Sequence, residues 1–126
     1  MNVSSHQAQR AVRGALPCVT AKAAVEGLTR ALAVDYGPHG IPVNAVALGS
    51  VRTERYDAFL SGHEPAAAAR IEDQMRLLHP VGRVGRPDES ASAVAYLLRE
   101  EASVITGAGV PVDGGRSARA RGPEEA

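Results

Sequence analysis

Three residues near the N-terminus have types and spacing suited to chemistry on a carbonyl or alcohol group. Ser5 follows a short apolar start and is expected at the end of a strand, and Lys22 is expected early in a helix. A strand-end serine that faces a helix-borne lysine across one loop can polarise a carbonyl or hydroxyl oxygen. Cys18, four residues before Lys22, occupies the position where a proton-transferring phenol would be useful.

The order Ser5, Cys18, Lys22 resembles the active-site segment of the short-chain dehydrogenase/reductase (SDR) family, in which a serine precedes a Tyr-x-x-x-Lys motif. Later stretches at 43–46 (VNAV), 49–53 (GSVRT) and 107–115 (GAGVPVDGG) also resemble the C-terminal half of that family. The resemblance covers residues 2 to 115. It implies an NAD- or NADP-dependent oxidoreductase that acts on small carbonyl or alcohol substrates.

The resemblance assigns a role to each of these catalytic positions. Ser5 would bind the substrate oxygen, and the neighbouring Ser4 is the weaker candidate because Ser5 has the family spacing. Lys22 would bind the nicotinamide ribose and lower the pKa of the neighbouring acid. Each residue also has an ordinary interpretation without a catalytic role. Ser5 would be a strand-end serine that bonds to the local backbone, and Lys22 would be a solvated lysine early in a helix.

Cys18 stands where the family has its tyrosine, so it decides the mechanism. A thiol has a suitable intrinsic pKa of about 8.5, but its side chain is shorter than tyrosine by a whole ring. General acid–base catalysis requires a reach of about 3 Å, and a bridging water is a poor substitute. A nucleophilic cysteine beside Lys22 is a second interpretation. We expect a small, buried or half-buried thiol with no catalytic part.

Residues 49–53 resemble the cofactor loop of the family, with Leu48 in place of its usual proline. The resemblance implies that Gly49, Val51 and Thr53 bind the cofactor, through the Val51 backbone and the Thr53 hydroxyl. Thr53 is also suited to capping the helix expected from residue 54, and the two roles are compatible.

The expected elements alternate between strands and helices along the chain. Apolar patterns predict strands at 1–5, 41–48 and 104–112, and helices at 17–36, over 54–79 and from 87. This order predicts parallel strands joined by right-handed crossovers, the C-terminal half of a doubly wound, Rossmann-like α/β sheet. Residues 1–115 are expected to form this partial domain, and 116–126 a disordered tail.

No glycine-rich turn follows a strand and opens a helix, so the dinucleotide-binding half of the fold has no counterpart in the sequence. We therefore expect a truncated SDR-like chain that is inactive in hydride transfer as it stands. Two alternatives stay open: a fragment of a working NAD(P)-dependent oxidoreductase whose upstream part is missing from the record, and a non-catalytic interaction module. The family resemblance implies homo-oligomer surfaces on the helix at 17–36 and on the helix and strand at 87–112.

Composition excludes several other classes of function. The 14 basic and 14 acidic residues give zero net charge, which argues against a nucleic-acid or anionic-membrane surface. No apolar run approaches the roughly 20 residues of a membrane span, and a single cysteine suits a reducing cytoplasm. His6, His39, His63 and His79 have no metal-ligand spacing, so we expect no metal site and four exposed loop histidines.

Overall fold

Three parallel strands form the centre of the structure, a computed structural model that describes residues 1–120. The strands β1 (Asn2–Ser5), β2 (Ala45–Leu48) and β3 (Gly109–Val112) lie in the order β1-β2-β3. In the register, Ser4 lies opposite Ala47 and Ala47 opposite Pro111. The predicted parallel pairing and order of elements are therefore confirmed.

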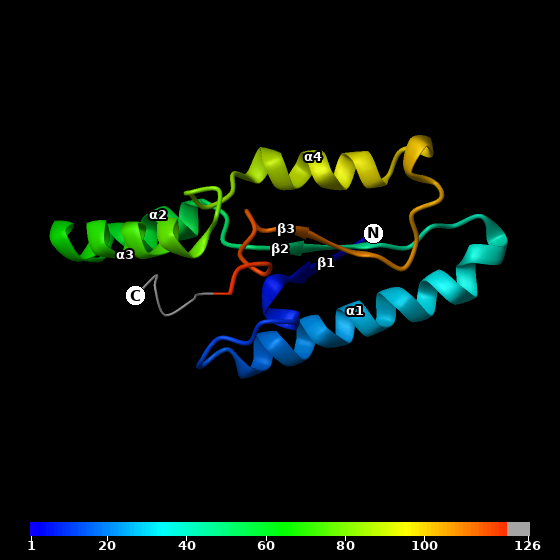
Figure 1. The fold of residues 1–126 in the computed structure, drawn as a ribbon, viewed down its shortest axis with the longest axis horizontal. Coiled ribbons are helices and arrows are strands. Elements are labelled where there is room, and N and C mark those ends of the chain that lie inside the picture. Colours follow the sequence, from blue (N-terminus) through cyan, green and yellow to red (C-terminus); the bar gives the residue numbers. More distant parts are fainter. Residues whose placement is uncertain (121–126) are drawn as a thin grey trace.

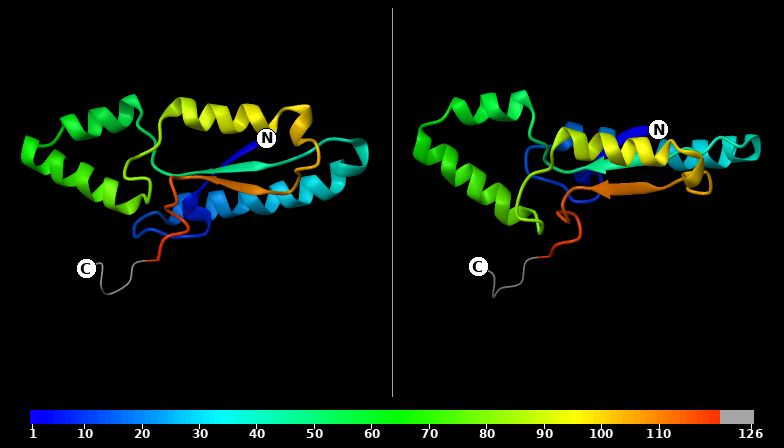
Figure 2. Two further views of the ribbon diagram at one scale, coloured as in Figure 1. Left: turned by 45° about the horizontal axis from the view of Figure 1, so that its top comes forward. Right: turned by 90° about the horizontal axis from the view of Figure 1, so that it is seen from above.

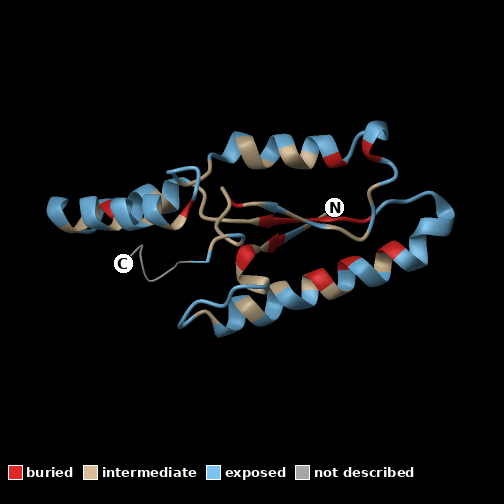
Figure 3. Cartoon of the chain, in the orientation of Figure 1, coloured by how far each residue is buried: buried red, intermediate tan, exposed pale blue. Residues whose placement is uncertain are grey.

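Helices cover both faces of this sheet (Figure 1). Helix α1 (Leu16–Tyr36) lies on one face and α4 (Pro87–Leu97) on the other. Between them, β2 is the most buried strand, with Ala45, Val46 and Ala47 at most 3% exposed. Figure 3 shows this burial along β2 and on the side of α1 that faces the sheet. No helix within residues 1–120 is long and apolar enough to cross a membrane.

The remaining helices connect these layers. Helices α2 (Glu54–Ser61) and α3 (Pro65–Leu78) extend beyond the end of the sheet and are largely exposed (Figures 2 and 3). The helical region expected over 54–79, with Gly62 and Pro65 as its interruptions, consists of these two helices: Gly62 follows α2, and Pro65 begins α3. Three 3₁₀ turns complete the fold: η1 (His6–Ala8), η2 (Gly37–His39) and η3 (Glu100–Ala102).

Helix α1 matches the expected span but packs on an unexpected face. Pro17 lies in its first turn, where a missing N–H costs little, and the helix passes into η2 at Gly37. Its buried residues are Glu26, Thr29 and Ala33, spaced at i, i+3 and i+7. The apolar residues whose helical spacing predicts this helix, Val25, Leu28 and Leu32, lie beside this face, and Leu28 is 52% exposed.

A polar seam of four side chains joins α1 to β1. The Asn2 amide donates to the Thr29 hydroxyl at 2.9 Å, and the Ser4 hydroxyl donates to the Glu26 carboxylate at 3.1 Å. Thr29 in turn donates to the Val25 carbonyl at 2.7 Å. Buried polar groups must find partners, and here each one pairs with a group on the facing element. These pairs explain why a polar face of α1 is buried.

Two strands are shorter than predicted because side chains replace part of the ladder. The strand expected at 41–48 begins at Ala45, and the one expected at 104–112 begins at Gly109. Between the preceding segments, the Asn44 side chain donates to the Ile105 carbonyl and accepts from the Ala108 N–H, at 2.6 and 3.1 Å. The Val43 N–H donates to the Thr106 hydroxyl at 3.0 Å.

The segment expected to be a tail begins with ordered turns. The Asp113 carboxylate accepts from the N–H groups of Gly115 and Ser117 at 2.9 and 2.8 Å, and the Arg116 N–H donates to the Asp113 carbonyl. Gly114 and Gly115 both have positive φ angles, +62° and +83°, a conformation that favours glycine. Residues 121–126 of the expected tail lie outside the described residues.

Gly49 provides a stability test because it lies directly against the backbone after β3. A Cβ at this position would lie 2.8 Å from the Asp113 Cα, whereas one at Gly27 within α1 would meet nothing within 4 Å. We expect Gly49→Ala to lower the free energy of unfolding by about 1–3 kcal/mol through overpacking. The control Gly27→Ala should raise it by about 0.5–1 kcal/mol. If urea unfolding gave the same change in unfolding free energy for both variants, the close packing of Gly49 against Asp113 would be contradicted.

Glu89 in the first turn of α4 provides an acid-stability test. Hydrogen bonds from Arg83 and from the Arg86 N–H lower its pKa from 4.5 to about 2. A folded-state pKa below the unfolded value stabilises the protein above pH 4.5, and this contribution is lost as the pH falls toward 2. We expect Glu89→Gln to flatten the fall in unfolding free energy over that window. If the unfolding free energy of Glu89→Gln fell with pH as steeply as that of the unaltered chain, the stabilising role of Glu89 would be contradicted.

Candidate functional site

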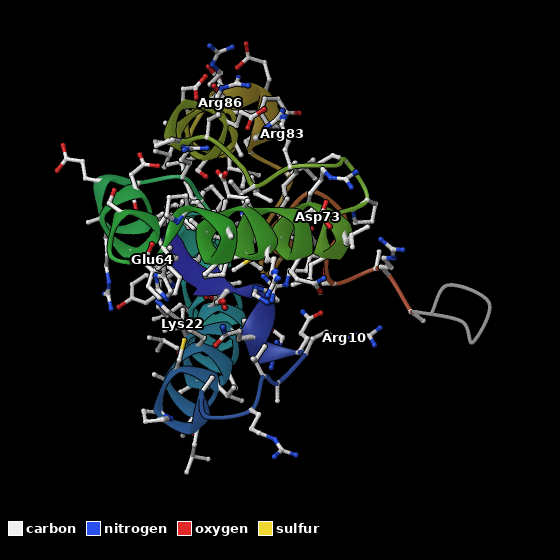
Figure 4. The ribbon with its side chains drawn as sticks, turned by 90° about the vertical axis from the view of Figure 1, so that its left-hand side faces the viewer. Arg10, Lys22, Glu64, Asp73, Arg83 and Arg86 are labelled. Carbon is white, nitrogen blue, oxygen red and sulfur yellow. The ribbon has the colours of Figure 1, made fainter. Side chains whose placement is uncertain are left out.

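The carboxyl ends of all three strands meet at one edge of the sheet, the usual place for a ligand site in an open parallel sheet. Ser5 ends β1, Leu48 ends β2 and is followed by Gly49, and Asp113 follows β3. Figure 4 views the molecule from this side, with α3 in front and Lys22 and Arg10 below it. The predicted site residues therefore come from segments that converge at one edge.

Ser5 is half-buried and caps the 3₁₀ turn η1. Its hydroxyl oxygen accepts from the Gln7 N–H at 3.2 Å. This bond uses one acceptor position and leaves the hydroxyl hydrogen able to donate. Ser4, in contrast, is 2% exposed and its hydroxyl lies against α1, near the Lys22 carbonyl and the Glu26 carboxylate. Of the two serines, only Ser5 lies outside the seam with α1.

Lys22 reaches from α1 to the open edge of β1. Its ammonium donates to the Val3 carbonyl at 2.9 Å. The Asn2 N–H bonds to the Asn44 carbonyl on the β2 side, so the alternation of a parallel ladder turns the Val3 peptide away from β2. The ammonium has three donors, and this contact uses one of them.

Cys18 lies one helical turn before Lys22, which puts the two side chains on the same face of α1. Cys18 is exposed, so the expectation of a buried or half-buried thiol is wrong. The first turn of α1 follows the long loop after η1, and Figure 3 shows it as largely exposed. Within residues 1–120, no hydrogen bond joins the side chains of Ser5, Cys18 and Lys22.

The loop at 49–53 has a defined backbone geometry. Val51 forms an isolated parallel bridge to Gly85: the Gly85 N–H donates to the Ser50 carbonyl, and the Arg52 N–H donates to the Gly85 carbonyl, both at 2.9 Å. In such a bridge, the peptide groups of Val51 itself point to the opposite side. The Thr53 hydroxyl accepts from the Tyr56 N–H at 3.3 Å and caps α2, as expected from the sequence.

Two of the four histidines are not exposed, contrary to the sequence-based expectation. His6 and His79 are 5% and 1% exposed, because they lie beneath the segments that cross the carboxyl end of the sheet. His6 Nδ1 lies 3.3 Å from the Leu48 carbonyl, and His79 Nδ1 lies 2.6 Å from the Met75 carbonyl. Burial lowers the pKa of His6, and the nearby Arg116 lowers it further.

Arg116 is a residue of this edge that sequence reasoning missed, because it was assigned to the tail. Its guanidinium donates to the Ser50 hydroxyl at 2.7 Å and so connects the turn after β3 to the loop at 49–53. Burial raises the pKa of Asp113, but hydrogen bonds from Ser117 and Gly115 outweigh it, so the pKa lies below its ordinary value. The sequence did offer a signal for Arg116, because this residue comes shortly after a strand that ends at the edge of the site.

Comparison with known proteins agrees with this geometry. A family model described as enoyl-(acyl carrier protein) reductase matches residues 1–117. The chain is 45% identical over 97 residues to protein FixR of Bradyrhizobium diazoefficiens. It is 43% identical over 100 residues to a 2,5-dichloro-2,5-cyclohexadiene-1,4-diol dehydrogenase of Sphingobium indicum. These alignments cover 77% and 79% of the chain, but the chain spans only 31% and 38% of the length of these relatives.

Solved structures show the same relation. Ligand-free aldohexose dehydrogenase of Thermoplasma acidophilum superposes with a TM-score of 0.85 at 40% identity, over 94% of this chain and 48% of that one. A tyrosine-to-phenylalanine variant of ElxO with NADPH bound superposes with a TM-score of 0.83 at 30% identity, over 94% and 46%. Sequence, topology and these matches together show that the chain belongs to the short-chain dehydrogenase/reductase family, with a Rossmann-like fold of which it contains a part.

Proposed function

We propose that this chain carries the catalytic segment and C-terminal part of an NAD(P)-dependent oxidoreductase, and that its 126 residues do not transfer hydride by themselves. The observation that carries the proposal is the position of Cys18. It lies on the same face of α1 as Lys22 and it is exposed. We infer from the family resemblance that it stands in the place of the proton-transferring tyrosine. The proposed substrates are small carbonyl or alcohol compounds, by analogy with the relatives, and the proposed compartment is the cytoplasm.

The residues at the carboxyl edge fit the nicotinamide end of such a cofactor. The Val51 peptide groups point away from the bridge to Gly85, so they are placed to pair with a carboxamide. Lys22 retains two donors for ribose hydroxyls, and Thr53 contributes its hydroxyl beside the same loop. Gly49 allows the close backbone approach of this loop to Asp113. When bound, the cofactor would supply or accept the hydride.

The remaining chemistry would fall to side chains of this chain. Ser5 would donate its hydroxyl hydrogen to the substrate oxygen, because its bond to Gln7 leaves that donor available. Lys22 would hold a positive charge near the reacting oxygen. Proton transfer is the incomplete step, since the Cys18 thiol is shorter than a tyrosine phenol by a ring. The pyrophosphate end has no glycine-rich strand-turn-helix among these 126 residues.

A chimeric chain tests the role of Cys18. The 126 residues would be completed upstream with the segment of the Thermoplasma aldohexose dehydrogenase that precedes its aligned region, and Cys18→Tyr made in that background. We expect Cys18→Tyr to raise the rate of NAD(P)H-dependent carbonyl reduction by about 10²–10⁴-fold, the usual contribution of a positioned acid or base. Lys22→Met in the tyrosine chimera should abolish the gain.

Equal turnover with cysteine and tyrosine would contradict the proposed loss of proton transfer and indicate that water or another group acts instead. The comparison stays informative because both chimeras share the same upstream segment, and far-UV circular dichroism shows whether both fold.

A non-catalytic module that associates with itself is the second candidate, and the exposed apolar side chains favour it. Leu28 and Val34 on α1 are 52% and 76% exposed, and Leu98 and Val104 after α4 are 67% and 90% exposed. We infer that these side chains give the chain apolar faces on both sides of the sheet, which a second copy would cover. The polar seam to β1 turns Leu28 away from the sheet, so it is available to a second copy.

Sedimentation velocity tests this surface. We expect the chain to form a dimer or larger homo-oligomer, and Leu28→Lys to shift it toward the monomer by at least about tenfold in dissociation constant, because a charge would replace an apolar contact. Phe59→Lys on α2, a residue with similar exposure, is the matched control and should leave association unchanged. A monomeric unaltered chain would exclude this candidate.

A further inference from the structure

A small basic pocket lies at the carboxyl end of the sheet, beside the loop that follows Ser5. Its volume is about 190 Å³, and its walls come from residues 6–12, from Leu78 at the end of α3, and from Arg116 and Arg119 after β3. At about 30 Å³ for each water in the liquid, this space holds about six waters or one small oxyanion. The size suits a single functional group.

The charge of the pocket is positive. Arg10, Arg116 and Arg119 contribute three guanidinium groups, and none of the described residues that line the pocket is acidic. The nearby Asp113 carboxylate is occupied by the N–H groups of Gly115 and Ser117. The Arg10 guanidinium is exposed and forms no hydrogen bond or ion pair within residues 1–120, whereas the Arg116 guanidinium donates to Ser50 and that of Arg119 donates to the Leu77 carbonyl. The pocket thus combines two held guanidinium groups with one that can move toward a ligand.

His6 is a second feature that indicates a ligand. It is a wall residue of the pocket, it is 95% buried, and its Nε2 is shielded from solvent without a hydrogen-bond partner within the described chain. Leaving a buried polar atom without a partner costs about 1–3 kcal/mol, so such atoms in native proteins usually mark a bound water, ion or ligand.

We propose that this pocket binds the carboxylate or phosphate group of a small-molecule ligand through Arg10 and Arg116. The His6 Nε2 would accept a hydrogen bond from a hydroxyl group of the same ligand, because the His6 Nδ1 faces the Leu48 carbonyl and therefore carries the ring hydrogen. A guanidinium matches the two oxygens of either group with two parallel hydrogen bonds. Val12 and Leu78 provide an apolar wall for the adjoining carbon skeleton. His6 directly follows Ser5, and Arg116 bonds the loop at 49–53, so the bound group would anchor a molecule beside the proposed catalytic serine.

The identification of that molecule as the oxidoreductase substrate rests on the proposed function, whereas anion binding does not. The test is therefore made without cofactor. Inorganic phosphate and acetate are titrated into the isotope-labelled 126-residue chain at an ionic strength held constant with sodium chloride, and NMR signals of the His6 ring and of the arginine Nε–H groups are followed. We expect a saturable shift at His6 and Arg116. Acetamide, the neutral analogue of acetate, should produce none.

Two variants locate the binding. Arg10→Gln should weaken it by about three- to tenfold, the effect of one partly exposed charged contact. Arg13→Gln, an exposed arginine in the same loop but outside the pocket, should leave it unchanged. Arg116→Lys keeps the charge but loses the paired donors, so it should also weaken binding. If Arg116→Lys fails to fold, the Arg10 and Arg13 variants decide the question alone.

The two anions distinguish the sources of the group. Tighter binding of phosphate assigns the pocket to phosphorylated ligands, and tighter binding of acetate assigns it to carboxylates. Equal shifts with chloride alone, equal affinities in the Arg10 and Arg13 variants, or no saturable shift would each overturn the proposal. None of these results would affect the proposed oxidoreductase function, which is measured by hydride transfer.

Discussion

The hydrogen-bonded burial of Glu26 against β1 sets the orientation of α1, and most of the candidate site follows from it. The carboxylate accepts from Ser4 and from Gln9, at 3.1 and 3.3 Å, and the residue is only 8% exposed. A buried carboxylate without donors would cost several kcal/mol, so a rotation of α1 that separates Glu26 from Ser4 is strongly disfavoured. This one orientation directs Lys22 to the edge of β1 and turns Leu28 outward.

The same constraint explains how the catalytic positions are used within this chain. Lys22 donates to a strand-edge carbonyl, and Ser5 accepts from the turn that follows it. The Ser5 bond satisfies a local backbone group, as the ordinary interpretation of a strand-end serine expected. Lys22 differs from the ordinary interpretation of a solvated lysine, because it donates to a carbonyl on a different element, β1. Neither prevents a further bond, because the ammonium and the hydroxyl each retain a donor. Ser5 and Lys22 thus form bonds that support folding, and Cys18 is exposed one helical turn before Lys22.

Much of the fold could be predicted from the sequence, because helix ends and strand order depend on local signals. Pro17, together with Gly37 and Pro38, predicted the ends of α1, and the alternation of elements predicted a parallel sheet. The buried face of α1 could not be predicted, since Glu26 and Thr29 are buried only because Ser4 and Asn2 face them. The predicted strand lengths were wrong for a similar reason. The Asn44 side chain, in place of backbone groups, bonds to Ile105 and Ala108, which lie 61 and 64 residues further along the chain. The burial of His6 and His79 likewise depends on segments distant in sequence.

Cofactor binding tests the central claim most directly. Urea unfolding of the 126-residue chain would be followed by far-UV circular dichroism with and without saturating NADH or NADPH. The account predicts the same midpoint in all three conditions, because these residues provide only the nicotinamide end of a site. A ligand present at 100 times its dissociation constant stabilises the folded state by about 2.7 kcal/mol, which would raise the midpoint by about 1 M or more. A rise of that size with either cofactor would contradict the account.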